Sequence, residues 1–416
     1  MSETLSGLKI SEHDLVCLIR PLVLDDLSGI DDAVDLFCSA AWSQLCEPGD
    51  ALAGLLVEAL GSQQALSLVI SRADPKIFIE QITNAGFFAE ASQRFADLAG
   101  VLKLGLARWT LRLSMQDLEM SLKTHAQLSG NLISESHQLW PSGLRDLGWS
   151  SPRVLWSRGA LRTLPKFEAS LSLVGSRSAT NYGEQVVTEL VSGVVERDVT
   201  IISGGAFGID GIAHRSAMAL EANTVAIMAG GLDRLYPLGN SQVLNRIVEK
   251  GIIISELPPG VPPTKWRFLQ RNRLIAAMSV ATVVVEAGAR SGSINTANHA
   301  LELQRQLGAV PGPITSQTSA GCHRLIRDQA AQLVACASDV LELMGVWQTN
   351  TTLDQLSWGP LETRVYDAIG FGSKTLETIC KSAGLTPNEA AMALGSLELL
   401  GDIERHLNRW QRAKSI

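Results

Sequence analysis

Three short segments place glycine beside hydroxyl-bearing or basic side chains, which are the residue types that bind phosphate. They begin at Gly175, Ser203 and Ser291, and each leads into a stretch with a helical apolar pattern. Glycine lets the backbone approach an anion closely, N–H groups at a helix N-terminus point toward it, and an arginine can hold two of its oxygens. We therefore predict phosphate-binding turns formed by Gly175, Ser176, Arg177, Ser203, Gly204, Gly205, Ala206, Ser291, Gly292 and Ser293.

A fourth segment, residues 263–273, combines four cations with two aromatic side chains and contains no acid. Single-stranded nucleic acid requires this combination, because cations neutralise phosphates and a flat ring stacks on an unstacked base. Several anion-binding turns along one sheet edge also suit a polymer of phosphates better than a single pyrophosphate. The alternative is that Arg271 and Arg273 are structural and bind buried carboxylates. The candidate contacts are Lys265, Phe268, Arg271 and Arg273.

Residues typical of nucleotide hydrolysis or metal catalysis are missing from these segments. The second glycine loop matches neither GxGxxG nor GxxxxGK[ST], and the cysteines form no CxxC pair. Asp210 and His214 stand four residues apart, but a metal site needs three or four ligands. We interpret this pair as structural support for the loop. We expect no catalytic residue, no metal and no cofactor.

The elements that position these segments follow from the pattern between about residues 169 and 344. Short apolar, β-branched runs alternate there with helical patterns, which is typical of a parallel sheet covered on both faces. This order predicts a doubly wound α/β sheet whose ligand-binding loops lie at the C-terminal ends of the strands. The expected strands are Ser170–Val174, Val199–Ser203, Thr224–Met228, Ile252–Ser255, Ala281–Glu286 and Ala309–Val310. The expected helices are Tyr182–Arg197, Ile209–Leu220, Asn240–Glu249, Asn295–Leu307 and His323–Asp328.

The rest of the chain divides into segments that differ in sequence pattern. Residues 1–128 have helical spacing and no catalytic pattern, so we predict an α-helical N-terminal domain. Residues 129–168 are an irregular connector, 169–345 the α/β domain, 346–357 a linker and 358–416 a C-terminal domain. Tryptophans of the connector could form a stacking platform, although packing onto a neighbouring domain is the favoured interpretation. They are Trp140, Trp149 and Trp156.

The last domain has three helical patterns followed by a short hairpin, which indicates a winged helix. Thr386 is the expected cap of its third helix and Pro387 the first helical residue. Winged helices commonly place this helix in the major groove of duplex DNA. Here the only ionisable residues between 387 and 400 are Glu389 and Glu398, which repel phosphate. A protein-contact or structural role is therefore favoured. The observation that still supports DNA binding is the presence of basic residues in the wing: Arg405, His406 and Arg409.

Composition restricts where any nucleic-acid site lies. The chain has 416 residues, is 46% apolar and 19% charged, and has a formal net charge of −7, so its whole surface cannot attract DNA. The site must be local. The N-terminus lacks the pattern of a signal peptide, and no apolar run approaches the roughly 20 residues of a membrane helix. We expect a cytoplasmic protein without a membrane partner, and cysteines that are mostly buried.

Taken in order, the motifs resemble the DNA-processing protein A family (DprA, also called Smf) over about residues 170–335. The resemblance implies an extended Rossmann-like domain that binds single-stranded DNA, forms a homodimer and helps load the RecA recombinase in natural transformation or repair. It also implies phosphate contacts from Arg177 and residues 203–206, and DNA contacts from Lys265 and Phe268. Leu269 departs from the proline that the family usually has there. The motifs are Gly175-Ser176-Arg177, Ser203-Gly204-Gly205-Ala206, Gly208-Ile209-Asp210, Ala213-His214, Tyr236-Pro237, Ser255-Glu256, Phe268, Arg271-Asn272-Arg273, Ser291-Gly292-Ser293 and Thr296-Ala297.

Two alternatives remain at this point. One is a nucleotide-processing enzyme of the lysine-decarboxylase-like phosphoribohydrolase type, but the chain lacks that group's PGGxGT loop, and Glu286 has no partner acid in a matching place. The other is a duplex-DNA regulator that acts through the winged helix.

Overall fold

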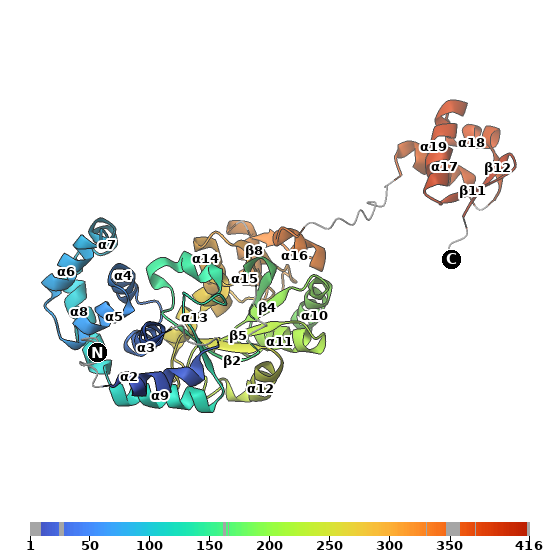
Figure 1. Ribbon diagram of the computed structural model, residues 1–416. Coiled ribbons are helices and arrows are strands. Elements are labelled where there is room, and N and C mark those ends of the chain that lie inside the picture. The colour runs from blue at the N-terminus through green and yellow to red at the C-terminus, as the bar shows by residue number, and fades with distance from the viewer. Residues whose placement is uncertain are drawn as a thin grey trace. The chain divides into compact units, whose positions relative to one another are not determined.

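The computed structural model describes residues 10–24, 29–160, 164, 166–329, 331–346, 358–370 and 372–413. The chain separates into two compact units, residues 1–347 and 348–416. The first unit contains a large sheet with helices on both faces and a group of N-terminal helices at one side (Figure 1).

The sheet of the first unit has nine strands in the order β1-β2-β6-β5-β4-β3-β7-β8-β9. The strands from β6 to β9 are parallel, whereas β1 and β2 are antiparallel to their neighbours. Its central strands are apolar and fully buried, as both faces are covered. Their bounds are β1 Asn131–Ile133, β2 Leu155–Gly159, β3 Ser170–Val174, β4 Thr200–Ser203, β5 Thr224–Met228, β6 Ile252–Ser255, β7 Ala281–Val284, β8 Gln306–Ala309 and β9 Gln332–Leu333.

Two sets of helices cover the two faces. One apolar core joins the sheet to α10, α11 and α16, and another joins it to α13, α14 and α15. Because β3 pairs with both β4 and β7, the direction of winding reverses between β3 and β7. Open α/β sheets bind ligands outside the strand ends at this switch point. The helices are α10 Asn181–Val195, α11 Ile209–Ala219, α12 Ser241–Lys250, α13 Lys265–Ala277, α14 Gly292–Glu302, α15 Ala320–Asp328 and α16 Ala337–Leu343.

The predicted doubly wound sheet is confirmed. Most differences between the predicted and the observed helices and strands concern the residues at which they begin and end. The strand expected at residues 309–310 instead covers Gln306–Ala309, and α14 begins at Gly292, three residues before the expected start. Helix α13 was not predicted from the sequence. Strands β1 and β2 lie in the segment predicted to be an irregular connector, although both extend the sheet beyond β6.

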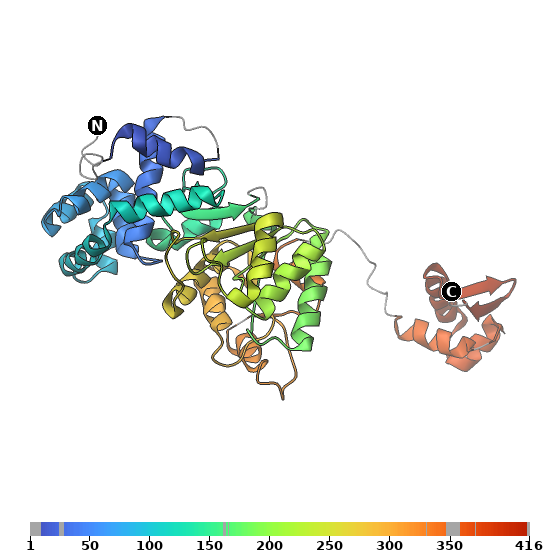
Figure 2. The same cartoon turned by 90° about the horizontal axis from the view of Figure 1, so that it is seen from below.

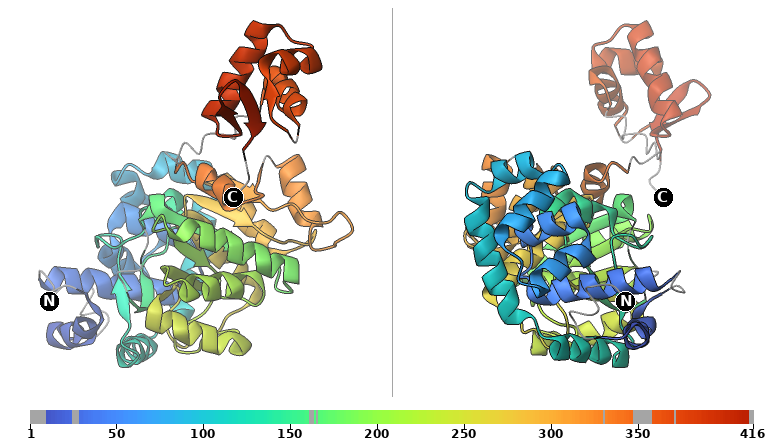
Figure 3. Two further views of the ribbon diagram at one scale, coloured as in Figure 1. Left: turned by 90° about the vertical axis from the view of Figure 1, so that its right-hand side faces the viewer. Right: turned by 60° about the vertical axis from the view of Figure 1, so that its left-hand side comes forward.

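The N-terminal helices pack against the β2 side of this sheet. Trp42 of α3 and Trp156 of β2 are fully buried in one shared core, and the Trp156 indole donates to the Ser43 hydroxyl at 3.1 Å. The views from below and from the side show the blue-to-cyan helices gathered at this side (Figures 2 and 3). The described helices are α2 Glu12–Ile19, α3 Ile30–Leu45, α4 Ala51–Leu60, α5 Ser62–Ile70, α6 Pro75–Asn84, α7 Phe88–Arg94, α8 Leu98–Arg112 and α9 Met115–Gln127.

Connector tryptophans are part of this packing. Trp140, Trp149 and Trp156 are 6%, 7% and 0% exposed, so they offer no open ring face to a base. Trp149 stacks on Phe95 of the N-terminal helices with ring centroids 6.2 Å apart. The favoured interpretation of these residues as packing groups therefore agrees with their burial.

The second unit is a winged helix with a core of its own. It consists of α17 Pro360–Ile369, β10 Lys374–Thr375, α18 Leu376–Ala383, α19 Pro387–Leu399, β11 Ile403–His406 and β12 Arg409–Arg412. Thr386 caps α19, and Glu389 completes the capping box, as the helix start predicted from Thr386 and Pro387 requires.

No single described helix is long and apolar enough to span a membrane. Helices α4 and α5 together have the length and composition of a membrane span, but the chain bends by 114° between them. Their side chains Leu55, Leu56 and Leu66 are fully buried in the N-terminal core. Among the cysteines, Cys38, Cys46 and Cys322 are buried as expected, whereas Cys17 and Cys336 are exposed.

Candidate nucleic-acid interface

A cavity of about 730 Å³ lies at the switch point of the sheet. The loops after β3 and β7, the middle of α13, the first turn of α14 and the loop before α15 form its walls. Hydroxyl, amide and guanidinium groups lie among the apolar atoms of its lining. The lining residues are Val174, Gly175, Ser176, Arg177, Ser178, Ala206, Asp210, Phe268, Leu269, Arg271, Asn272, Ile275, Gly288, Ala289, Ser291, Gly292, Ser293, Thr296, Gln317, Thr318 and Ala320.

The loop after β3 is held by close packing and by one buried acid. A Cβ atom on Gly175 would lie 2.6 Å from the Ile209 side chain and 2.9 Å from the Glu286 carbonyl oxygen, so only glycine fits. The Glu286 carboxylate is 2% exposed and accepts from the Thr180 amide at 2.9 Å and the Thr180 hydroxyl at 2.6 Å. It also accepts from Thr318 at 3.2 Å. Glu286 thus joins two walls of the cavity.

Arg177 is an exposed cation at this cavity. Its guanidinium carbon lies 5.1 Å from the centre of the Phe268 ring, which supports the side chain by a cation–π contact. Within the described ranges Arg177 has no acidic partner. Its charge is therefore available to an anion that enters the cavity.

The second glycine loop uses its polar groups internally. The Ser203 hydroxyl is buried and donates to the Leu173 carbonyl at 2.6 Å. The amides of Gly204 and Ala206 donate to the Asp210 carboxylate at 3.2 and 3.4 Å. Of the predicted residues 203–206, only Ala206 lines the cavity. An internal carboxylate therefore occupies the position at which we expected the loop amides to meet phosphate.

Asp210 and His214 both stabilise the surroundings of this loop, but they do so separately. Burial raises the pKa of Asp210, and the nearby Arg271 guanidinium and the loop amides oppose that rise. His214 is fully buried, and its Nδ1 lies 2.7 Å from the Thr224 hydroxyl of β5. Burial lowers the pKa of His214 to about 3, so the ring is neutral at ordinary pH. No group of three potential metal ligands occurs among the described residues.

Most of the cations in residues 263–273 bind groups of the protein itself. Arg271 is 6% exposed and donates to the Gly204 and Ile227 carbonyls, and burial lowers its pKa to about 10. Arg267 forms an ion pair with Glu47 of the N-terminal helices. Lys265 at the start of α13 is exposed and does not line the cavity. Arg267, Arg271 and Arg273 thus all bind groups of the protein, but the partners of Arg271 are backbone carbonyls rather than a carboxylate.

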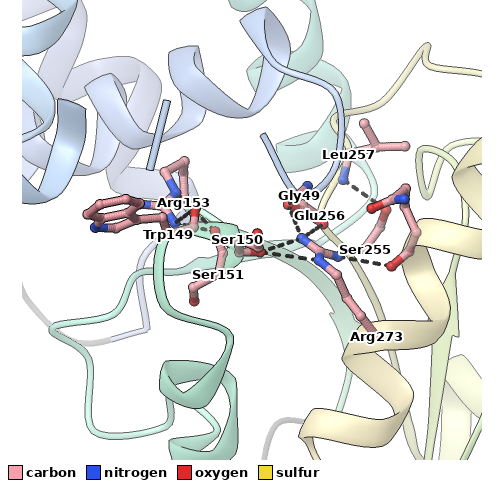
Figure 4. Close-up of polar contacts among 10 residues, drawn as sticks. Gly49, Trp149, Ser150, Ser151, Arg153, Ser255, Glu256, Leu257 and Arg273 are labelled. Atoms are coloured by element: carbon pink, nitrogen blue, oxygen red, sulfur yellow. Dashed lines mark hydrogen bonds and ion pairs between the residues drawn. The ribbon is translucent and has the colours of Figure 1, made fainter. Parts of the chain in front are cut away.

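Arg273 lies on the side of α13 that faces the N-terminal helices, as Figure 4 shows. Its guanidinium approaches the Glu256 carboxylate at 2.7 Å and donates to the Ser150 carbonyl at 2.9 and 3.2 Å. The Gly49 amide donates to the same carboxylate at 3.4 Å. Arg273 is 3% exposed and is not part of the cavity wall. It fixes α13 to its neighbours.

The first turn of α14 forms the opposite wall. Ser291 caps this helix, and its hydroxyl lies 2.8 Å from that of Ser293. Asn272 of α13 donates to the Gly292 carbonyl at 3.3 Å and to Asn295 at 3.1 Å, which links the two helices. Two predicted turns thus line the same cavity: Gly175, Ser176 and Arg177 on one wall, and Ser291, Gly292 and Ser293 on another.

Several lining residues were absent from the predicted site. Gln317 and Thr318 follow the Pro311-Gly312-Pro313 turn after β8, and Asn272 lies between two arginines. The order of the strands brings these segments together. The proline-rich turn was the only sign in the sequence of the 317–318 wall.

A doubly wound sheet with a cavity at its switch point, followed by a winged helix, defines a Rossmann-like protein. Residues 131–345 match the family model described as DNA recombination-mediator protein A, and residues 351–407 match the DprA winged helix domain. The chain belongs to the DprA/Smf family of DNA-processing proteins.

The similarity to individual relatives covers most of the chain. It is 42% identical to a putative DNA processing protein DprA of Mycobacterium tuberculosis over 73% of this chain and 82% of the relative. It is 35% identical to the DNA processing protein DprA of Bacillus subtilis over 51% and 70%. The X-ray structure of DprA from Streptococcus pneumoniae superposes with a TM-score of 0.56 at 27% identity, covering 73% of this chain and 95% of that one.

Proposed function

We propose that this protein binds single-stranded DNA in the switch-point cavity, protects the strand and helps load the RecA recombinase onto it. The observation that supports the proposal most directly is Arg177, an exposed guanidinium without an acidic partner in the described part of the chain, held against an aromatic ring beside a wall of hydroxyl groups. The guanidinium and the hydroxyl groups are both suited to binding a phosphate.

The cavity favours a single strand over a duplex. The Phe268 ring is half-buried among α13 and the glycine loops, where a paired and stacked base cannot reach it. An unpaired strand can place a phosphate at Arg177 and a base at the adjacent rings. A net charge of −7 agrees with a local site, because the remaining surface does not attract DNA.

The predicted site residues divide into two groups under this proposal. Those at the cavity surface contact DNA, together with the exposed Lys265: Gly175, Ser176, Arg177, Ala206, Phe268, Ser291, Gly292 and Ser293. The others position the contact groups, and of these Asp210 and Arg271 also border the cavity: Ser203, Gly204, Gly205, Asp210, His214, Arg271 and Arg273.

We propose no catalytic activity and no cofactor for this cavity. The acid that a phosphoribohydrolase would need is not available, because the Glu286 carboxylate accepts three hydrogen bonds from Thr180 and Thr318. Incubation of the pure protein with nucleoside monophosphates should release no free base. Release of base that disappears in Glu286→Gln would contradict this part of the proposal.

The partners follow from the family. A recombination mediator transfers a strand to a recombinase, so we propose RecA as a partner, a homodimer as the working form and the cytoplasm as the place of action. Recombinase loading is tested by strand exchange on DNA coated with single-strand binding protein. The chain should raise the rate, and an unchanged rate would contradict the loading role.

The ligand class is tested by one titration. A fluorescent oligonucleotide and its duplex are each titrated with the full-length protein at two salt concentrations. The single strand should bind more tightly, and its affinity should fall linearly with the logarithm of the salt concentration. Equal or tighter binding of the duplex would favour the winged-helix regulator instead.

A further inference from the structure

Three aromatic rings from three separate segments lie at or near the cavity: Phe268 lines it, Tyr236 contacts Phe268, and Phe207 follows the lining residue Ala206. Phe268 lies on α13, Tyr236 between β5 and α12, and Phe207 between β4 and α11. The rings of Tyr236 and Phe268 are 5.9 Å apart and inclined by 56°. Phe207 packs over Gly239, where a Cβ atom would lie 2.7 Å from its ring. The Tyr236 ring therefore adjoins Phe268, and Phe207 packs on the segment that follows Tyr236.

The three rings differ in what their faces contact. Phe268 is half-buried, with the guanidinium carbons of Arg177 and Arg271 at 5.1 and 5.6 Å from its centre. Tyr236 is 48% exposed and Phe207 45% exposed. A single exposed apolar residue is ordinary, but two exposed rings on linked loops next to a cavity form a surface suited to a ligand. Tyr236 and Phe207 thus leave more of their ring faces open than Phe268 does.

The loops that bear these two rings are fixed to each other. The Asn240 side chain is buried, and its amide donates to the Gly205 carbonyl at 3.2 Å and the Ala206 carbonyl at 2.7 Å. It therefore joins the segment after Tyr236 to the segment before Phe207. A surface held in place before binding loses less conformational freedom when a ligand arrives.

A cation accompanies the rings. Arg215 of α11 is exposed, and its Nη1 atom lies 3.4 Å from the Cβ position of Gly211 in the first turn of that helix. Among the described residues it has no ion-pair partner. The same Cβ position of Gly211 lies 3.1 Å from the Asn240 amide, so Arg215 lies near the residue that joins the two ring-bearing loops. A cation near stacking rings is what a strand's phosphates and bases need together.

We propose that Tyr236 and Phe207 form a second base-binding subsite, with Arg215 facing the phosphates of the same nucleotides. This inference rests on the proposed function. The strand leaves the cavity across the start of α11 and the segment before α12, and its unpaired bases stack on the two rings. Because every base has a flat face, the subsite accepts all four bases.

The test compares strands that fill only the cavity with strands that extend beyond it. Oligothymidylates of increasing length are titrated with wild-type protein, Tyr236→Leu and Tyr236→Trp. Leucine keeps apolar volume but removes the stacking face, so Tyr236→Leu should weaken long strands by roughly 5- to 150-fold while short strands and the salt slope stay unchanged. Tyr236→Trp should bind like wild type.

Two further variants complete the design. Phe88→Ala removes a ring of matched exposure, 43%, from α7 of the N-terminal helices and should not change binding. Phe207→Leu should repeat the effect of Tyr236→Leu, and it replaces that variant if thermal melting shows that Tyr236→Leu is not folded. Abasic long strands should remove the advantage of wild type over both leucine variants.

The outcomes separate the subsite from the proposed function. If Tyr236→Leu and Phe207→Leu bind long strands as wild type does while Arg177→Ala binds weakly, the second subsite is wrong and the cavity proposal stands. If the wild-type protein binds no single strand, the proposed function fails and the subsite with it. Length-dependent loss in both leucine variants, but not in Phe88→Ala, supports the subsite.

Discussion

Arg267 of α13 forms a two-point ion pair with Glu47, which lies 220 positions earlier in the chain. Nε of Arg267 is 3.0 Å from Oε2 of Glu47, and Nη2 is 2.8 Å from Oε1. Arg112 of α8 donates to the same carboxylate. Burial acts to raise the pKa of Glu47, but the hydrogen bonds from Arg267 and Arg112 outweigh it and lower the pKa below its ordinary 4.5. The N-terminal helices thus hold the helix that bears Phe268.

Removing this carboxylate should destabilise the first unit. Glu47→Gln leaves the guanidinium of Arg267, whose side chain is 13% exposed, without an acid, so we expect the free energy of unfolding to fall by about 1–3 kcal/mol. Glu119→Gln removes an exposed acid that pairs with Lys123 and should cost only about 0.3–0.5 kcal/mol. Urea unfolding followed by tryptophan fluorescence measures both. Equal losses in the two variants would show that the Glu47 pair has no special role.

Arg177 and Arg273 should affect different properties of the protein, Arg177 the binding of DNA and Arg273 the stability of the fold. Arg177→Ala should weaken single-strand binding and lower the salt slope by about one unit, because it removes roughly one phosphate contact. Its thermal stability should stay near that of wild type, because the side chain is exposed. Arg273→Ala leaves Glu256 buried without its cation and should reduce stability by about 3–5 kcal/mol. A salt slope that changes in Arg273→Ala but not in Arg177→Ala would reverse the assignment.

Phe268 should affect both stacking and charge. Its ring supports the Arg177 guanidinium at 5.1 Å, so Phe268→Ala should reduce affinity and also lower the salt slope. A ring that contacts only a base would leave the slope unchanged. The measurement is the same titration at four salt concentrations, with Phe268→Tyr as the conservative control. A slope equal to that of wild type in Phe268→Ala would contradict the coupling to Arg177.

Buried histidines should make stability depend on pH. Burial lowers the pKa of His214 to about 3 and that of His125 to about 4. The unfolded chain binds protons at these residues below their ordinary pKa of 6.5, whereas the folded chain does not. Stability is therefore fully present above pH 6.5 and falls as the pH decreases toward these lowered pKa values, by up to about 1.4 kcal/mol per pH unit for each histidine. Urea unfolding at pH 7, 6 and 5 measures the slope, and His125→Gln should make it shallower.

The winged helix should contribute little to single-strand binding. The described surface of α19 bears Glu389 and Glu398, and the unit packs around a core of its own. A chain of residues 1–347 should therefore keep affinity for a single strand within about threefold of the full chain. Residues 348–416 alone should bind weakly. If the chain of residues 1–347 lost most of its affinity for a single strand, the binding site would have to be assigned to the second unit.

The sequence by itself determined the doubly wound sheet, because most of its parallel strands, such as Thr200–Ser203 and Ala281–Val284, are short apolar, β-branched runs with glycine soon after, and such patterns are local. Because the carboxyl ends of parallel strands share one edge, it also indicated that turns after the strands gather there, and the turns with Gly175, Ser176, Arg177, Ser291, Gly292 and Ser293 line one cavity. The pairing of β1 with β2 and of β2 with β6 could not be predicted, because short antiparallel strands depend on partners far away in the chain.

The tertiary structure alone decided which cations are free. Lys265, Arg267, Arg271 and Arg273 look equivalent in a sequence without local acids, yet Glu47, Glu256 and two backbone carbonyls bind three of them. The same holds for the second glycine loop, whose amides are taken by Asp210. Composition records the charges present in a segment, whereas desolvation and distance determine whether a charge remains available, and both depend on residues that only folding brings near.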